Sequence, residues 1–559
     1  MDKRFFRLLL ICLISAAAAL AQPVINGSAF SSAVARGLGT PGAGVAQGSI
    51  FIVYGSGLGP AYPGISAPAG VFPLPLSLGG SSGVSVAVTV GGTQVPAIML
   101  FAISYQATAI LPSNTPLGAG TVTVTYNGQT SAPAPIQVVA STFGIYTYSE
   151  QGYGQSIATD LNYAVNTIIH TFHPGDWVTL WGTGLGAISA SDANPAPVGN
   201  VGTVTVYVGN AAASNVQYWG RSPYFAGLDQ VNFQIPQGVT GCYVPVAVQT
   251  GGVAGNIGNF TTIAVSDSGS TCSDSLMGQD LVADLAAGQT VDFGYIRLES
   301  WVAQFVSGSA DTGAYDLGIA TFSEYTPDSA GNAEYGVSSG YCEAVDCSFY
   351  CGGVMSYTAN LGDSSSAQLD AGASLSVTHG PNFPLSQEYQ GGGFYYGFLS
   401  NAGRYLFSDF TYPVVGAGGS AIGAFTATDV TGSATAFLTG INNAQTVSRS
   451  ADLNLAWTGG DPTLQNGQLT IYAQSFNQNV TPNQFAFVQC TAPLAAGKFT
   501  IPAWVLAALP VSGTGGIGNF TYPEGWIQIG QYNKPVTFSA PGLTKGIITD
   551  ILVVGQFEF

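Results

Sequence analysis

Candidate catalytic chemistry in this sequence depends on very few residues. The 559 residues include only three histidines, and a serine hydrolase needs one beside its nucleophile. Two Gly-x-Ser-x-Gly matches nominate Ser81 and Ser338. The hydrolase turn requires a helix after the serine, whereas Ser81 leads into a strand-like stretch and Ser338 into a cysteine-rich one. Ser338 with His379 and Asp346 is the least unfavourable triad, and we assign no catalytic residue.

Metal chemistry is equally weakly indicated. His170 and His173 form His-x-x-His before a Pro-Gly-Asp turn, with Asp176 nearby. A zinc site favours helical His-x-x-x-His spacing or adjacent cysteine and carboxylate ligands. We therefore interpret these histidines as part of a polar loop and predict no metal and no cofactor.

Carboxylates gather between residues 295 and 350, which is the most acidic part of the chain. Two carboxyl groups brought close together can hydrolyse glycosidic bonds, so a secreted hydrolase centred here remains an alternative. The acidic residues are Glu299, Glu324, Glu334, Glu343 and Asp346.

Two glycine-rich turns, Gly55–Gly59 and Gly182–Gly186, follow apolar runs in the manner of phosphate-binding loops. A dinucleotide fingerprint needs a helix directly after the glycines, so that the helix N-terminus faces the phosphates. Prolines and glycines interrupt both following segments, which excludes a helix there. We therefore expect the glycines to serve positive φ angles or close backbone approach at strand ends, and not a ligand.

The glycine turns belong to a repeat of roughly 120 residues, the size of a sandwich domain. In the first copy, Val84–Gly92 and Gly120–Pro133 alternate apolar and polar residues, and Asn127-Gly128 predicts a type I′ hairpin. In the second copy, Val204–Asn210 and Val244–Asn256 show the same patterns in the same order.

Composition favours an all-β protein. Charged residues make up 7% and glycine numbers 76, whereas helical proteins build their surfaces from Glu, Lys, Arg and Ala. The formal charge of −18 argues against binding to nucleic acid or to anionic membranes, because both need clusters of Lys and Arg. An acidic surface of this kind keeps an exported protein in solution.

The first 21 residues have the layout of a secretory signal peptide. Lys3, Arg4 and Arg7 precede an apolar run that ends in Ala19-Leu20-Ala21. We therefore expect a secreted, cell-surface or periplasmic protein with no membrane span in the mature chain.

Of the seven cysteines, Cys12 lies in this leader, and an even number remains for disulfides. They are Cys242, Cys272, Cys342, Cys347, Cys351 and Cys490. Cys242 and Cys272 flank one predicted domain end and are candidates to pair.

Three motifs of the second copy together resemble the Solibacter C-terminal domain family. They are "HPGDWVTLWGTGLG", "VTVYVGN" and "LDQVNFQIPQG", within residues 143–265. A divergent copy covers about 40–140, where "YQATAILP" keeps only Gln106 and Pro112 of the third motif. The resemblance implies immunoglobulin-like β-sandwich modules of exported bacterial proteins, without an established activity. Such modules usually close a chain, whereas residues 266–559 follow here.

The second half is also read as β-rich, with a linker near 266–275 and one short helix-like segment at 275–288. Cys490–Pro510 resembles a β-domain that recurs in exported proteins of similar bacteria. The predicted organisation is a signal peptide, two immunoglobulin-like sandwiches, a β-rich domain and a final β-sandwich. Their ranges are 1–21, 22–142, 143–270, 271–420 and 421–559.

Aromatic residues between 387 and 412 are the remaining candidates for ligand binding. Exposed rings beside polar groups stack on sugars, and an edge strand can present them to a protein; packing inside a sandwich is the competing interpretation. The nominated residues are Tyr389, Phe394, Tyr395, Tyr396 and Tyr405.

The sequence thus predicts a non-catalytic structural or adhesive protein, with polysaccharide or a cell-surface protein as partner. A carbohydrate-binding protein is the first alternative.

Overall fold

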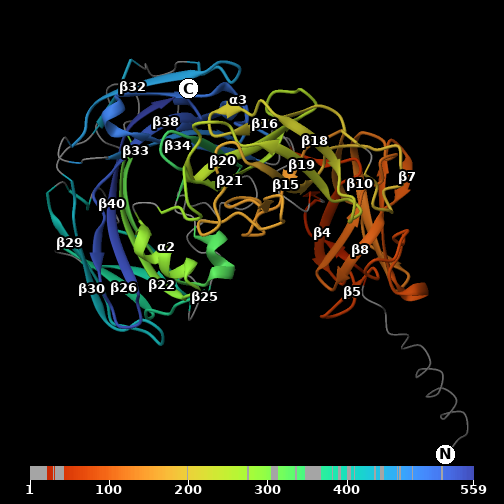
Figure 1. Ribbon diagram of the computed structural model, residues 1–559, viewed down its shortest axis with the longest axis horizontal. Helices are drawn as coiled ribbons and strands as arrows, with labels where there is room; N and C mark the ends of the chain where they lie inside the picture. The colour runs from red at the N-terminus through yellow and green to blue at the C-terminus, as the bar shows by residue number, and fades with distance from the viewer. Residues whose placement is uncertain are drawn as a thin grey trace, which may run out of the picture.

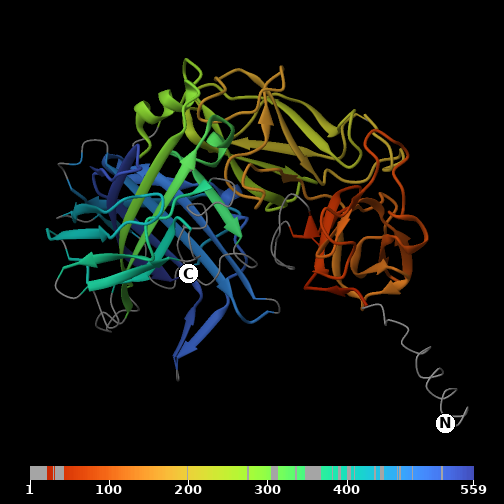
Figure 2. The same ribbon diagram turned by 90° about the horizontal axis from the view of Figure 1, so that it is seen from below.

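The computed structural model describes residues 22–28, 30–31, 43–197, 199–273, 276–303, 313–333, 336–346, 367–379, 382–387, 392–399, 405–407, 409–432, 436–440, 446–461, 464, 467–480, 483–517 and 520–558. The predicted signal peptide lies outside them. Three β-rich units follow one another in space (Figure 1), and the turned view shows the same succession (Figure 2). The chain is an all-β, multi-domain protein, as its composition indicates.

The first unit is a sandwich of two sheets. One sheet has the order β1-β4-β9-β8-β5 with β2 also on β4, and the other has β3-β12-β10-β6-β7 with β11 on β10. The strands of the first sheet are β1 (Val24–Ile25), β2 (Phe30–Ser31), β4 (Ile50–Ser56), β5 (Ile65–Ser66), β8 (Ile98–Ile103) and β9 (Gln106–Ile110). Those of the second are β3 (Val45–Ala46), β6 (Val84–Val90), β7 (Thr93–Pro96), β10 (Gly118–Tyr126), β11 (Gln129–Thr130) and β12 (Ala134–Val139), with the 3-10 turn η1 (Gly80–Ser82) before β6.

The second unit repeats this arrangement. Its sheets are β13-β15-β19-β18, with β14 on β15, and β17-β16-β20-β21. The strands are β13 (Gly144–Ile145), β14 (Ala158–Thr159), β15 (Trp177–Thr183), β16 (Val204–Val208), β17 (Ala211–Ala212), β18 (Val216–Arg221), β19 (Asp229–Gln234), β20 (Gly241–Thr250) and β21 (Ile257–Val265). The strand that leads into each glycine-rich turn pairs in the same way, since β4 pairs with β9 and β15 with β19.

Period-two alternation produces these sandwiches. In β6, the valines at positions 84, 86, 88 and 90 are buried and the residues between them are half-buried, because successive strand side chains point to opposite faces. Asn127 and Gly128 have φ angles of 50° and 75° and join β10 to β11. This confirms the predicted two-residue hairpin, which needs positive φ at both turn positions.

The repeat begins earlier than the sequence patterns suggested. β1 pairs with the end of β4, and β13 pairs with the end of β15. β2 and β14 pair with earlier residues of the same two strands. The parallel pairing of β3 with β12 also recurs as a bridge between Phe172 and Val265.

The third unit is built on one 14-stranded sheet with the order β24-β34-β33-β38-β40-β22-β23-β28-β27-β26-β29-β30, plus β25 on β23 and β39 on β40. The elements before residue 430 are α2 (Gly278–Ala286), β22 (Val291–Ala303), β23 (Gly313–Tyr325), η2 (Pro327–Asn332), β24 (Cys342–Asp346), β25 (Ala367–Gln368), β26 (Ser374–Thr378), β27 (Asn382–Gln387), β28 (Phe394–Phe398), β29 (Thr411–Gly416) and β30 (Phe425–Val430).

The remaining elements complete the long sheet and add two small ones, β31-β32-β35 and β36-β37. They are β31 (Ala436–Thr439), β32 (Leu453–Gly459), β33 (Gln468–Asn477), β34 (Gln484–Pro493), η4 (Leu494–Ala496), β35 (Lys498–Ile501), α3 (Ala503–Leu506), β36 (Thr514–Ile517), β37 (Phe520–Pro523), β38 (Gly525–Tyr532), β39 (Val536–Phe538) and β40 (Lys545–Glu558). The helix-like segment expected at 275–288 forms α2.

The expected boundary at residue 420 falls in the turn between β29 and β30, which pair over six residues. The first and last long strands of the unit, β22 and β40, also lie side by side in parallel. Residues on both sides of 420 therefore share one sheet. Alternation identifies strands but not their partners, so no sequence pattern indicated this continuity.

The long sheet is covered on both faces. On one face, Ile296 and Leu298 of β22 contribute to one apolar core, and Ile527 and Ile529 of β38 contribute to a second. On the other face, Phe293 and Tyr295 of β22 pack with Leu281, Val282 and Leu285 of α2. Figure 1 shows α2 beside β22.

Candidate functional site

The second glycine turn does bind an anion, and that anion is the chain's own Asp229. The backbone amides of Gly184 and Leu185 donate to Asp229 Oδ2 over 2.7 and 2.8 Å. Gly184 has a φ of +110°, and a Cβ there would lie 2.1 Å from the carbonyl oxygen of Thr142. The expected roles of positive φ and close backbone approach are both confirmed at this glycine.

Arg221, at the end of β18, neutralises this carboxylate. Its Nη1 donates to Asp229 Oδ1, and its Nη2 donates to the carbonyl oxygen of Gly186 over 2.7 Å. Only 2% of the Arg221 side chain is exposed. Complete burial raises the pKa of Asp229, while Arg221 and the two turn amides act in the opposite direction. Sequence reasoning missed Arg221 because it lies outside the turn; the aspartate that opens "DQVNFQIP" was the available signal.

The first glycine turn has no such carboxylate, because Tyr105 occupies the position equivalent to Asp229. There the amide of Gly55 donates to the carbonyl oxygen of Tyr105, and the amide of Leu58 to that of Ser104, each over 3.0 Å. Both turns are therefore bound by the neighbouring strand connection within their own unit, as expected of a structural feature.

Arg221 and Asp229, together with Asp192, also lie at the contact between the first and second units. Asp192, whose Oδ1 lies 3.7 Å from Arg221 Nη2, accepts hydrogen bonds from the amide and hydroxyl of Ser113 in the first unit. Gly48 of the first unit lies so close that a Cβ there would be 1.9 Å from Arg221 Nη2. Ile98 and Ile110 add an apolar contact with Ala226 of the second unit.

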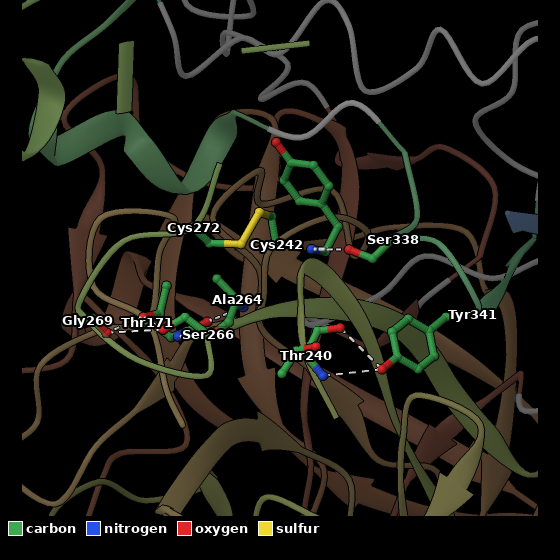
Figure 3. The surroundings of a disulfide bond; sticks show 11 residues. Thr171, Thr240, Cys242, Ala264, Ser266, Gly269, Cys272, Ser338 and Tyr341 are labelled. Atoms are coloured by element: carbon green, nitrogen blue, oxygen red, sulfur yellow. Dashed lines mark hydrogen bonds between the residues drawn. A yellow bond between two sulfur atoms is a disulfide. The ribbon is translucent and has the colours of Figure 1, made fainter. Parts of the chain in front are cut away.

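A second joint connects the second unit to the third. Trp504 of α3 stacks on Tyr207 of β16, with ring centroids 4.2 Å apart, and on Phe260 of β21, at 5.5 Å. Nearby, the hydroxyl of Tyr341 donates to the carbonyl oxygen of Thr240 over 3.2 Å (Figure 3). Aromatic stacks of this kind exclude water and fix the relative orientation of their carriers.

Two of the predicted disulfides are present. Cys242 and Cys272 are bonded beside this joint (Figure 3), which confirms the candidate pair. Cys342 of β24 is bonded to Cys490 of β34, its direct neighbour in the sheet. Cys347 and Cys351 lie outside the described residues.

The members of the possible serine triad are engaged elsewhere. Ser338 Oγ accepts a hydrogen bond from the amide of Tyr243 over 2.8 Å (Figure 3), and the amide of Ser338 donates to the carbonyl oxygen of Tyr243. His379 Nδ1 lies 3.2 Å from the carbonyl oxygen of Thr411, and its ring packs on Phe410. The side chains of Asp346 and Ser81 lie outside the described residues.

The other histidines form loop contacts. His173 Nδ1 lies 3.2 Å from Asp176 Oδ2, and its Nε2 lies 2.8 Å from the carbonyl oxygen of Gly269. His170 lies 3.6 Å from Asp160. Within the described parts of the chain, no group of three or more His, Cys, Asp or Glu side chains is arranged to hold a metal ion.

Of the acidic residues between 295 and 350, Glu299 is neutralised by a neighbour on its own strand. Arg297 Nη2 lies 2.5 Å from Glu299 Oε1, and Trp301 Nε1 donates to Glu299 Oε2 over 2.7 Å. Both charged side chains are buried, and burial raises the pKa of nearby Tyr295 and Tyr472. The charge pair and the two phenols therefore lie together on the face of the sheet that α2 covers.

The other nominated acidic residues lie apart from this pair. Glu324 lies beside Asp292 across the β22–β23 ladder, Glu343 is buried in β24, and Glu334 lies outside the described residues.

Three of the nominated aromatic residues, Phe394, Tyr395 and Tyr396, lie in β28 and divide between its two faces. Tyr395 is fully buried, and its hydroxyl donates to the carbonyl oxygen of Gly372 over 2.8 Å. Tyr405 is 8% exposed. Phe394 and Tyr396 are half-buried and pack against the core beside α2. Tyr389 lies outside the described residues.

Three phenylalanines of the same segment are the more exposed ones. Phe398, Phe407 and Phe410 have exposed fractions of 54%, 47% and 45%. The rings of Phe407 and Phe410 lie 6.3 Å apart, and Phe410 rests against His379. The nominated set contained four tyrosines and Phe394 and none of these three phenylalanines, whereas Tyr395 lies in the core.

Comparisons with known proteins give no family for this chain. No family model matches it, and no curated protein matches it. Domains 5–6 of the S-layer protein SbsC are 16% identical over 44% of this chain and all of that one, with a TM-score of 0.16. SGBP-B from a complex xyloglucan utilization locus in Bacteroides uniformis is 9% identical over 96% of this chain and all of that one, with a TM-score of 0.14. The FN1–FN3 domains of chicken CNTN1 are 7% identical over 95% and 99% of the two chains, with a TM-score of 0.11. At these values the likenesses carry no argument about ligand or activity.

Proposed function

We propose that this chain is an exported, non-catalytic structural or adhesive protein in which three β units form one rigid body. The observation that carries this proposal is the pair of closed joints. In the first joint, buried Arg221 lies between Asp192 and Asp229, and Asp192 accepts a hydrogen bond from Ser113 of the first unit. In the second joint, Trp504 stacks on Tyr207 and Phe260. Flexible arrays expose the linkers between their domains, whereas both connections here are packed.

Export is supported by the leader sequence and by the two disulfides, because disulfides persist in oxidising compartments. Among the described residues, no helix is long and apolar enough to cross a bilayer. The acidic net charge of −18 keeps such a protein soluble and away from anionic surfaces.

The test uses the oxidised chain from Gln22 onward. We expect its small-angle X-ray scattering to fit one arrangement of the three units. We also expect it to sediment with at least one of insoluble cellulose, chitin and peptidoglycan without releasing soluble sugar. Scattering that needs many arrangements would contradict rigidity. Release of reducing sugar would contradict a non-catalytic role, and failure to sediment with all three would contradict adhesion to polysaccharide.

Carbohydrate binding by the third unit is the second candidate function, favoured by the exposed pair Phe407 and Phe410. Exposed aromatic rings supply stacking surfaces for sugars. The double variant Phe407→Ala with Phe410→Ala is expected to lose sedimentation with polysaccharide. The matched control is Tyr224→Ala with Phe225→Ala, which removes two rings of 62% and 63% exposure from the second unit. Equal losses in both variants would argue against a site at Phe407 and Phe410.

A further inference from the structure

Two aspartates from distant parts of the chain meet inside the third unit. Asp429 is the inward-facing residue near the end of β30, and Asp550 lies in the middle of β40. Their exposed fractions are 1% and 3%. β30 is the last strand of the long sheet and β40 lies near its centre, so the two strands are brought together by curling of the sheet around the core that contains Phe425, Ala427 and Ile548.

The hydrogen-bond partners of the pair are incomplete. Asp550 Oδ2 accepts a hydrogen bond from Asn533 Nδ2 over 2.6 Å. Asp550 Oδ1 and Asp429 Oδ2 are buried and have no hydrogen-bond donor. Among the described residues, no lysine, arginine or histidine forms an ion pair with either carboxyl group. Two adjacent buried carboxylates without a cation are costly, so the pair needs at least one proton or a cation.

We propose that Asp429 and Asp550 share a proton and form a pH-sensitive clasp that holds β30 against β40. A protonated carboxyl donates one O–H, and an ionised carboxyl beside it accepts that bond. Carboxyl-to-carboxylate hydrogen bonds are among the strong, charge-assisted ones. With one proton present, the pair therefore satisfies both of the buried oxygens that lack a donor. With none, two negative charges face each other in a space without a compensating cation.

The electrostatics agree in sign with this assignment. Burial raises the pKa of Asp429 to about 6. Burial and the negative charge of Asp429 raise the pKa of Asp550 well above its ordinary range. The other groups around the pair carry no charge: the phenol Tyr412 opposite Asp429 in the β29–β30 ladder, Asn533 after β38, Ser300 of β22 and Thr431 after β30. The titration therefore belongs to the two aspartates as a pair.

The clasp lies beneath the segment that carries Phe407 and Phe410. A small cavity is lined by Asp550, Ser300, Phe407, Thr431 and Gly432. Thr431, two residues after Asp429, donates from its hydroxyl to the carbonyl oxygen of Phe407 and accepts from the amide of Phe410 over 3.2 Å. Loss of the shared proton admits water to this cavity and loosens the hold of Thr431 on Phe407 and Phe410.

The direction of the pH dependence follows from proton linkage. In the unfolded chain both aspartates lose their protons near pH 4, whereas the folded pair retains at least one proton to higher pH. Since the folded state holds more protons, stability falls as pH rises. The folding equilibrium constant is expected to fall about tenfold per pH unit while the folded pair holds one proton more than the unfolded chain.

The experiment compares the full mature chain with Asp429→Asn between pH 5 and pH 9 by denaturant unfolding. The side-chain amide introduced by this substitution donates an N–H to Asp550 without titrating, so the variant is expected to lose the tenfold-per-unit difference. Asp409→Asn is the matched control, because Asp409 is exposed and asparagine tolerates its φ of 64°. This control is expected to keep the wild-type slope. Equal slopes in the wild type and in Asp429→Asn would overturn the proposal.

Two further measurements keep the proposal testable if Asp429→Asn folds poorly. Infrared spectra of the wild type at pH 7 are expected to show a protonated-carboxyl band that disappears on raising the pH, and absence of this band overturns the proposal. Calcium is the competing occupant of two buried carboxylates. A rise in wild-type stability on adding calcium chloride at pH 7, absent from Asp429→Asn, would assign the pair to a cation instead of a proton.

Discussion

Arg221 and Asp229 form an ion pair whose side chains are only 2% and 0% exposed. The pair sits where a glycine turn, a strand end and the neighbouring unit meet. Asp229 satisfies the turn amides, while Arg221 reaches toward Asp192 and the first unit. One buried charge pair therefore supports both the fold of the second unit and its joint with the first.

Replacing Asp229 is expected to be strongly destabilising. Asp229→Asn leaves Arg221 charged and buried without its partner, which costs about 3–5 kcal/mol. Denaturant unfolding of the oxidised chain measures this loss. Asp267→Asn, which changes an exposed aspartate of the same unit, is expected to stay within about 0.5 kcal/mol of the wild type. Similar effects of the two substitutions would show that the ion pair contributes little.

The second glycine turn gives a prediction with an internal control. Gly184→Ala places a Cβ 2.1 Å from the carbonyl oxygen of Thr142 at a φ of +110°, so we expect a loss above about 3 kcal/mol from strain and collision. Gly199→Ala also has positive φ, +63°, but its Cβ enters open space, and about 1–2 kcal/mol is expected. Thermal unfolding of both variants checks the order. A smaller loss for Gly184→Ala would contradict the close approach.

The two disulfides should stabilise the protein unequally. Cys242 and Cys272 are separated by 30 positions, and Cys342 and Cys490 by 148. In the chain-entropy model, closing these loops contributes about 3.6 and 5 kcal/mol. Paired Cys→Ala variants, measured by denaturant unfolding, are expected to show the larger loss for the second pair. Equal losses would contradict the dependence on loop length.

Trp504 should control the joint between the second and third units. Trp504→Ala removes two aromatic stacks, worth about 1–3 kcal/mol together, without opening the long sheet. Small-angle scattering is expected to show a broader distribution of shapes, and hydrogen exchange to increase in β16 and β21. Tyr224→Ala, an exposed aromatic substitution, is the control. Unchanged scattering in Trp504→Ala would place the rigidity of this joint in the Tyr341 and disulfide region.

The repeat and the fold class were readable from the sequence because both are local properties. Alternation in Val84–Gly92 and the Asn127-Gly128 turn depends on residues that are neighbours in the chain. The same is true of the glycine turn, whose missing helix showed that it was structural. The even cysteine count likewise indicated disulfides, and the position of Cys242 and Cys272 at a predicted domain end suggested one correct pair.

Partnership across long distances was decided only by the tertiary structure. The sequence around Gly184 does not predict that Arg221 lies beside its turn, and the sequence around Asp429 does not predict a contact with Asp550. Strand order and sheet curvature bring these residues together. Alternation puts Tyr395 and Phe398 on opposite faces of β28, but only the packing of the sheet decides that the face of Tyr395 is the buried one. A sequence determines which residues alternate and turn, whereas burial in a shared core determines which distant charges must meet and neutralise each other.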